Sequence, residues 1–317
     1  MKKIYNYNGE SIGVVLASPE CYGAIGDGEN DDTIAFQKAL TDNKYIVCNP
    51  NSTYYITASL RVKKNTTLDL NGSTIVFAVR HGFFNFLEGD TFGEYNGNGN
   101  IIIRNGYIIG GDISFIHGEN ITIENVHFRN CENDHVIEIC ACKNFTVRNC
   151  SLIGMAFWET SLEYINVDIT ATYGAFPWNN SGQGTAFYDN TVCENIKIIG
   201  NYFAIGDTPY NNGNDAFGVH AKNAPSGVHQ DNIVVKDNII KGFALCGLRV
   251  NNMHNVIISN NHIDTQGSCV LIGDRIASDD VLISYNYLNS DTTLIDKVSS
   301  SNVTVAYNSV ITDNQDI

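Results

Sequence analysis

Apolar and polar residues alternate in short segments that recur along the chain. Each segment opens with Asn or Asp, alternates apolar residues, passes a polar turn and ends in a second apolar pair, as in NITIENVHF. This alternation predicts strands with one face turned inward. Copies begin at Asn100, Asn120, Asn144, Asn195, Asn232, Asn255, Asp280 and Asn302, with a degenerate earlier copy at Asn65. The interior is then expected to contain Ile121, Ile123, Phe145, Val147, Ile196 and Ile198.

The spacing of these copies predicts a solenoid. Successive starts lie 20, 24, 51, 37, 23, 25 and 22 residues apart. A unit of this length cannot bury its apolar face alone, so neighbouring units must stack. A third strand is expected in several units, at 135–139, 164–168, 216–220, 247–250 and 270–274. Three strands in ~20–25 residues are typical of a coil of a parallel β-helix.

The bend between the paired strands is rich in Asn, Gly and Asp, which suit tight turns. We expect asparagine side chains from successive coils to stack there as a structural amide ladder. The expected members are Asn149, Asn201, Asn238, Asn260, Asn261, Asn286 and Asn308.

A distinct motif precedes the repeats. Residues 22–40 read YGAIGDGENDDTIAFQKAL. The Gly-rich turn leads to Asp31, Asp32 and Thr33, which can cap a helix, and Ile34, Ala35, Ala39 and Leu40 predict an apolar helical face. The acidic residues of the motif, Asp27 included, are therefore expected to hold the turn and the cap.

This motif resembles the opening motif of the pectate-lyase superfamily. The resemblance implies an all-β, right-handed parallel β-helix with a short N-terminal helix that covers the first coil, followed by a strand at 51–56. Such motifs occur in microbial polysaccharide-degrading enzymes and in phage tail or tailspike proteins. We expect an N-terminal extension over 1–20 and one β-helix domain over 21–317, with loop insertions around 154–194 and 204–214.

Composition narrows the partners. The formal net charge of −15 disfavours nucleic acids and anionic membranes, and disfavours a strongly anionic substrate unless basic residues gather at one site. The nine cysteines lack a zinc-like spacing, so reduced and mostly buried thiols are expected, as is folding in a reducing cytosol. We expect no signal peptide and no membrane span. Cytoplasmic synthesis followed by release or virion association stays open.

Candidate chemistry lies on the outward positions of the third strands. Alternation turns these side chains out: Glu138, Tyr164, Asn166, Asp168, His220, Arg249, Asn251 and Asp274. Strand geometry separates the Cβ atoms of Glu138 and Asp168 by roughly 8 Å. Two carboxylates on one face suit glycosidic hydrolysis, in which one is the acid and the other the base, and this separation favours inversion. Glu138, Asp168 and His220 are therefore the predicted catalytic residues.

Further residues are predicted to bind substrate. Arg249 can hold a carboxylate or sulfate on a sugar, and His135 and Asp215 lie at the start of third strands, as groove-rim or turn residues. Trp158 and Trp178 belong to the long insertions near the cluster, where aromatic rings can either stack on sugars or pack the loops.

Three functions remain open on the sequence alone. The first is a glycoside hydrolase that needs no cofactor. The second is a polysaccharide lyase, in which His220 or Arg249 removes a proton and a Ca²⁺ ion neutralises the uronate. The third is a non-catalytic glycan-binding or tailspike module. The resemblance also raises a homotrimer.

Overall fold

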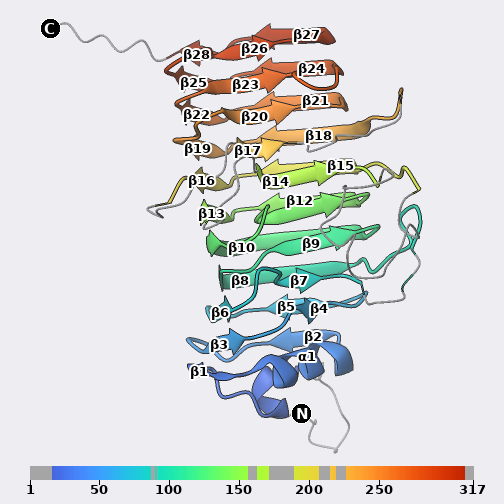
Figure 1. Ribbon diagram of the computed structural model, residues 1–317, viewed down its shortest axis with the longest axis vertical. Helices are drawn as coiled ribbons and strands as arrows, with labels where there is room; N and C mark the ends of the chain where they lie inside the picture. The colour runs from blue at the N-terminus through green and yellow to red at the C-terminus, as the bar shows by residue number, and fades with distance from the viewer. Residues whose placement is uncertain are drawn as a thin grey trace, which may run out of the picture.

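The computed structural model describes residues 16–86, 90, 92–155, 163–170, 189–206, 215–218 and 226–310. It is a right-handed parallel β-helix whose coils stack along one long axis, with α1 (Thr33–Asp42) and the 3-10 helix η1 (Pro19–Tyr22) at the N-terminal end (Figure 1). The fold expected from the repeat is confirmed.

Each complete coil contributes a strand to three parallel ladders. The first ladder contains β2 (Tyr45–Val47), β5 (Thr67–Asp69), β8 (Ile101–Ile109), β10 (Glu119–Cys131), β12 (Lys143–Arg148), β15 (Glu194–Ile199), β18 (Gln230–Lys236), β21 (Met253–Ser259), β24 (Ser278–Ser284) and β27 (Ser300–Ala306). The second ladder contains β1 (Asp27–Asp31), β3 (Thr53–Ile56), β6 (Thr74–Phe77), the second halves of β8 and β10, β13 (Ser151–Met155), β16 (Tyr202–Ala204), β19 (Ile239–Lys241), β22 (His262–Thr265), β25 (Tyr287–Ser290) and β28 (Ser309–Val310).

The third ladder is a separate nine-stranded sheet. It contains β4 (Leu60–Arg61), β7 (Phe83–Phe84), β9 (Ile113–Ile116), β11 (Ile137–Cys140), β14 (Glu163–Asp168), β17 (Asp215–Gly218), β20 (Cys246–Val250), β23 (Ser268–Ile272) and β26 (Ile295–Lys297). β11, β14, β17, β20 and β23 are the third strands expected from the sequence, and the sheet extends beyond them through β4, β7 and β9 towards the N-terminus and through β26 towards the C-terminus.

The core is a continuous apolar column inside the coils. Ile101, Ile121, Phe145, Ile196 and Ile233 occupy one register position of the first ladder, and all are fully buried. Each such side chain contributes about 1.5–3 kcal/mol through its burial. The six interior residues expected from the alternation are all confirmed as buried.

Two asparagine ladders tie the coils together. The residue that opens each repeat has a left-handed backbone, with φ between 51° and 58° from Asn100 to Asn302, a conformation that Asn tolerates better than most residues. The exposed ladder joins Asn65, Asn100, Asn120, Asn144 and Asn195 by side-chain amide hydrogen bonds. The buried ladder joins Asn201, Asn238, Asn261, Asn286 and Asn308.

The expected ladder was wrong in two members. Asn149 and Asn260 have φ of 53° and 55° and lie at the corner, one residue before the ladder position. Cys150 precedes Asn201 in the column, and its backbone N–H donates to Asn201 Oδ1 at 2.9 Å. The buried side chain therefore belongs to the residue after the left-handed corner.

The N-terminal motif holds the turn as expected, but Asp32, the N-cap residue of α1, makes no side-chain capping bond to the helix. Asp32 accepts hydrogen bonds from the N–H groups of Ile25 and Gly26, Asp31 accepts one from the N–H of Thr33, and Asp27 accepts those of Glu29 and Asn30. One helix residue departs from expectation. Ile34 is 83% exposed, because α1 buries Ala35, Phe36, Ala39 and Leu40 instead.

The cysteines match the expected reduced state. All nine are free, Cys21 is exposed and the other eight are buried. Across the described ranges, no helix combines the length and apolar content that a bilayer crossing requires.

Replacing Asn238 with Ala should destabilise the fold by about 2 kcal/mol, because it leaves buried partners unsatisfied. Asn238 Oδ1 accepts from both the N–H and the side-chain amide of Asn201, and its own amide donates to the Ile198 carbonyl. Denaturant unfolding measures the change. The matched control is Asn120→Gly in the exposed ladder, which retains the left-handed backbone and should cost less than about 1 kcal/mol. Equal losses in both variants would contradict the assignment of stability to the buried ladder.

Candidate functional site

The outer face of the nine-stranded sheet presents polar side chains in register. Ser114, Glu138, Asn166 and Gly218 pair in sequence across β9, β11, β14 and β17. Asp168 pairs with Cys140, so its position is diagonal to Glu138 on the adjacent strand. The sequence predicted this diagonal arrangement of Glu138 and Asp168.

Glu138 belongs to a buried hydrogen-bond network. Ser114 Oγ lies 3.4 Å from Glu138 Oε2 and donates to Asp112 Oδ2 at 2.6 Å. Asp112 also accepts from the N–H of Gly82 and from the Asn133 amide. Glu138 and Asp168 are each 3% exposed, so the two carboxyls lie beneath the molecular surface.

Burial and like charge act together on Glu138. Desolvation is the largest effect, followed by the charges of Asp168, Asp112 and Asp134, and together they hold the pKa of Glu138 well above its usual range. The Ser114 hydrogen bond opposes this rise. The environment therefore favours the protonated carboxyl of Glu138. Asp168 Oδ1 accepts a hydrogen bond from the N–H of Ile169 at 2.7 Å.

A second acidic group surrounds Arg249. Its Nη1 lies 3.1 Å from Glu163 Oε1, and its Nε lies 3.2 Å from Asp215 Oδ2 and 3.9 Å from Asp274 Oδ2. Arg249 is 2% exposed. Its guanidinium therefore lies beside protein carboxylates, and its predicted contact with a sugar substituent stays a prediction.

Gly218 makes room for this ion pair. A Cβ at position 218 would lie 2.8 Å from Glu163 Cγ and 3.3 Å from Arg249 Cβ. A side chain at position 218 on β17 would occupy the space between Glu163 on β14 and Arg249 on β20. Because Gly218 has none, Arg249 reaches Glu163 across β17.

Asp215 is the most perturbed member of the second group. Desolvation raises the pKa of Asp215 to about 7, Arg249 lowers it, and Glu163 raises it. The Cys246 thiol donates a hydrogen bond to Asp215 Oδ1 at 3.1 Å. Asp215 thus shares Arg249 with Asp274 and with Glu163, whose carboxyl also lies 3.7 Å from His135 Nδ1.

The remaining predicted residues lie around these two groups. His135 Nδ1 is 3.0 Å from the Glu163 carbonyl oxygen, and Asn166 is 1% exposed. The Asn251 amide donates to Asp274 Oδ1 at 2.6 Å. The Asp274 side chain is 24% exposed, so it forms part of the accessible rim of the cluster.

The predicted outward orientation of Tyr164 is wrong. Tyr164 is fully buried in the apolar core, its ring meets the Phe243 ring edge-on at 4.9 Å, and its hydroxyl donates to the Ala204 carbonyl. Both Tyr164 and Ile165 belong to the core, so strict alternation along β14 begins only at Ile165.

Three predicted residues lie outside the described part of the chain: His220, Trp158 and Trp178. Their roles stay predictions. The sequence analysis also missed Asp112 and Ser114, which belong to the Glu138 network. The alternating segment DISFI at 112–116 carried the signal, because it repeats the third-strand pattern one coil earlier.

The N-terminal part of the same face is apolar. Phe84, Phe86, Ile116 and Cys140 form a separate buried cluster. The Arg61 guanidinium lies 4.4 Å from the Phe84 ring centroid, within the range of a cation–π contact.

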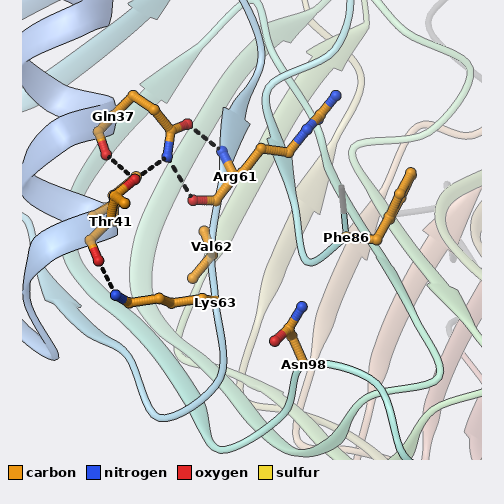
Figure 2. Close-up of a pocket in the computed structure, with 8 residues that line it drawn as sticks. Gln37, Thr41, Arg61, Val62, Lys63, Phe86 and Asn98 are labelled. Carbon is orange, nitrogen blue, oxygen red and sulfur yellow. Dashed lines mark hydrogen bonds between the residues drawn. The ribbon is translucent and has the colours of Figure 1, made fainter. Parts of the chain in front are cut away.

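A pocket of about 100 Å³ opens beside this apolar cluster (Figure 2). Figure 2 shows the Gln37 amide bonded to both the N–H and the carbonyl of Arg61. The pocket is lined by Gln37, Leu40, Thr41, Arg61, Val62, Lys63, Phe86 and Asn98. Since no acidic residue lines it, the pocket is chemically distinct from the carboxyl cluster around Glu138.

Comparisons with known proteins agree on the fold. No protein-family model matches the chain. Plasmin and fibronectin-binding protein A of Streptococcus pneumoniae is 26% identical over an alignment 322 residues long, which covers 86% of this chain but only 42% of that protein. The chain therefore spans less than half the length of this curated relative.

Solved structures extend the comparison. A crystal structure of PfbA, a surface adhesin of Streptococcus pneumoniae, matches 95% of this chain and 80% of its own, with a TM-score of 0.78 and 22% identity. A tailspike mutant of E. coli bacteriophage HK620 in complex with a pentasaccharide matches 96% of this chain and 56% of its own, with a TM-score of 0.63 and 15% identity. At these identities the likeness shows the shared parallel β-helix.

Stability should fall as the pH rises through about 7 because of Asp215. A carboxyl whose folded pKa is about 7, above the ordinary 3.8, stabilises the fold fully at low pH and loses that contribution as it ionises. Glu138 acts in the same direction. The loss runs between the two pKa values, so Asp215→Asn should flatten the dependence of Tm on pH between about 4 and 7.

Thermal unfolding across that pH range measures the effect. The matched control is Asp296→Asn on β26 of the same sheet, which should retain the wild-type profile. If the Asp215→Asn and wild-type profiles run parallel, Asp215 does not titrate in this range in the folded protein.

Proposed function

We propose that this protein recognises a glycan on the outer face of the nine-stranded sheet, around β9 to β23. The observation that carries the proposal is the convergence of carboxyl and amide groups from successive coils: Asp112, Glu138, Asn166, Asp168, Asp215, Asn251 and Asp274. Such groups pair with sugar hydroxyls. The fold shared with a pentasaccharide-bound tailspike and with a surface adhesin supports this function, and with it a location outside the cell or on a virion.

The charge balance of the face also supports a functional role. Arg249 faces three carboxyls, and one of them, Glu163, also lies 3.7 Å from His135 Nδ1. Burial and the neighbouring acids hold the pKa of Glu138 well above its usual range, and burial raises the pKa of Asp215. Acids with perturbed pKa values are typical of functional sites.

The exposed rim defines the first contact with a glycan. The side chains of Asp134 and Asp274 are 36% and 24% exposed, while Glu138 and Asp168 lie deeper. The acidic lining favours a neutral or amino sugar over a sulfated or uronic one, because two anions in a poorly hydrated groove repel.

Hydrolysis is a second candidate, favoured by the raised pKa of Glu138. A protonated Glu138 can donate its proton to the leaving glycosidic oxygen, and ionised Asp168 can accept a proton from the water that attacks the anomeric carbon. In this division of roles the proton is on Glu138, whose buried and acidic surroundings disfavour a negative charge.

The lyase alternative has weaker support from the described residues. Arg249, one of the two bases considered for it, is held by Glu163 and Asp215, and a guanidinium so placed is a poor proton acceptor. His220 and a Ca²⁺ ion stay as the proposed elements of that chemistry. Unsaturated sugar products formed with Ca²⁺ present would establish it.

Asp274→Ala should weaken glycan binding about tenfold or more by removing a rim carboxylate that meets sugar hydroxyls. A glycan array identifies the ligand, and calorimetry with that ligand gives the affinity. Asp296→Ala on the same sheet is the matched control and should bind as the wild type does. Binding of fibronectin or plasmin without binding of any glycan would assign the protein to protein adhesion instead.

Glu138→Gln and Asp168→Asn should each lower glycan cleavage by about 10²–10⁴-fold if hydrolysis occurs, because each removes one half of the acid–base pair. New reducing ends in the bound glycan measure turnover, and calorimetry shows whether binding persists. Wild-type binding without new reducing ends would establish recognition without hydrolysis. Near-normal turnover in both variants would remove these two residues from any catalytic role.

A further inference from the structure

The corner between the first and second ladders requires a left-handed backbone in every coil. Eight successive coils place a residue with φ between 53° and 67° at this corner. In order along the axis they are Asn105, Asn125, Asn149, Gly200, Asp237, Asn260, Tyr285 and Tyr307. Asn, Asp and Gly tolerate this region, whereas a bulky aromatic residue there is strained. The last two coils therefore depart from the rule that the earlier coils obey.

Packing does not compensate for this strain. Tyr285 and Tyr307 are 62% and 77% exposed. Their rings stack on each other, with centroids 5.2 Å apart and an interplanar angle of 15°, and so present aromatic surface to solvent. A residue that has a strained backbone and an exposed side chain is typical of a functional position.

Other aromatic surface continues onto the neighbouring strands. Tyr287 on β25 is 41% exposed, and its ring lies 4.9 Å from that of His262 on β22. Figure 1 shows β22, β25 and β28 together at the C-terminal end of the solenoid. Among the described residues, three of the five exposed tyrosines thus lie in the final coils.

Hydrogen-bonding groups lie beside these rings. Asp264 and Asn289 follow His262 and Tyr287 by two residues, so they point from the same face about 6–7 Å further along the strands. The Asn289 amide donates to Asp264 Oδ1 at 2.9 Å. An aromatic row and a carboxyl–amide row at this distance match the width of one pyranose ring.

We propose that Tyr285, Tyr307 and Tyr287, with Asp264 and Asn289, form a second glycan-binding site that takes a neutral hexose. The C–H face of the sugar stacks on the tyrosine rings, and its hydroxyls bond to the carboxyl and amide. The Asp264 carboxylate and the net charge of −15 disfavour uronates and sulfated sugars. This site lies on the second ladder and its corner, so it does not depend on the function proposed for the nine-stranded sheet.

The double variant Tyr285→Asn with Tyr307→Asn tests the site. Asn fits the corner in four earlier coils, so the variant should gain stability, with Tm rising by roughly 2 °C, while losing affinity about tenfold or more. A structural role for the tyrosines would give the opposite stability change. The probes are neutral gluco-, galacto-, xylo- and N-acetylchito-oligosaccharides, measured by NMR titration of the full chain.

The matched control is Tyr107→Ala. Tyr107 is 43% exposed, stacks on His127 and occupies the same register row as Tyr287, several coils towards the N-terminus. It should bind the probes as the wild type does. In the Asp274→Ala variant the probes should still shift the NMR signals of the tyrosine site even if binding at the nine-stranded sheet is weakened, which separates the two proposed sites.

Three outcomes would overturn the proposal. The double variant binds the probes as tightly as the wild type, or the wild type binds none of them. The third is that sedimentation shows a wild-type oligomer that the double variant dissociates while glycan binding persists. That last result would assign the tyrosines to contacts between copies of this chain.

Discussion

Parallel pairing of each coil with the next is the constraint on which the whole molecule depends. The pairing keeps a constant register, so residues at equivalent positions of successive coils stack along the axis and share one environment. Inward positions are apolar, corner positions have a left-handed backbone, and outward positions are polar or apolar. A single coil has neither a closed core nor paired strand edges, and both come from its neighbours. Side chains far apart in the sequence, such as Glu138 and Asp168, become adjacent through this register alone.

The sequence was sufficient for the architecture because the same environment recurs. The left-handed positions select Asn in nearly every repeat, and the interior selects Ile, Val, Leu and Phe at period two, so the signal accumulates over coils. The errors occurred where one coil departs from the average. At one corner Cys150, rather than the expected Asn149, occupies the buried column that Asn201 continues. Tyr164 points inward because two consecutive residues of β14 enter the core.

The candidate site was less predictable because its chemistry depends on depth. Alternation identified the outward face of β11 and β14, but it cannot distinguish an exposed carboxyl from one that is 3% exposed beside Asp112 and Ser114. It also cannot show that Arg249 is occupied by Glu163 and Asp215, since those contacts cross a strand that carries Gly218. The register of a strand can be read from its own sequence segment. A contact between side chains of three successive coils, such as that of Arg249 with Glu163, cannot.

The two proposed sites show two different ways in which a functional site can reduce the stability of a regular solenoid. On the nine-stranded sheet the cost is electrostatic, because carboxyl groups are buried close to one another, which raises the pKa values of Glu138 and Asp215. At the C-terminal corner it is conformational, because tyrosines occupy a backbone that suits Asn and Gly. Both departures occur on the outside of the coils, while the interior apolar column continues beneath them and the buried Asn ladder continues beside the tyrosines. Repetition therefore allows a coil to give up some of its own stability, since its neighbours on either side still hold it in register.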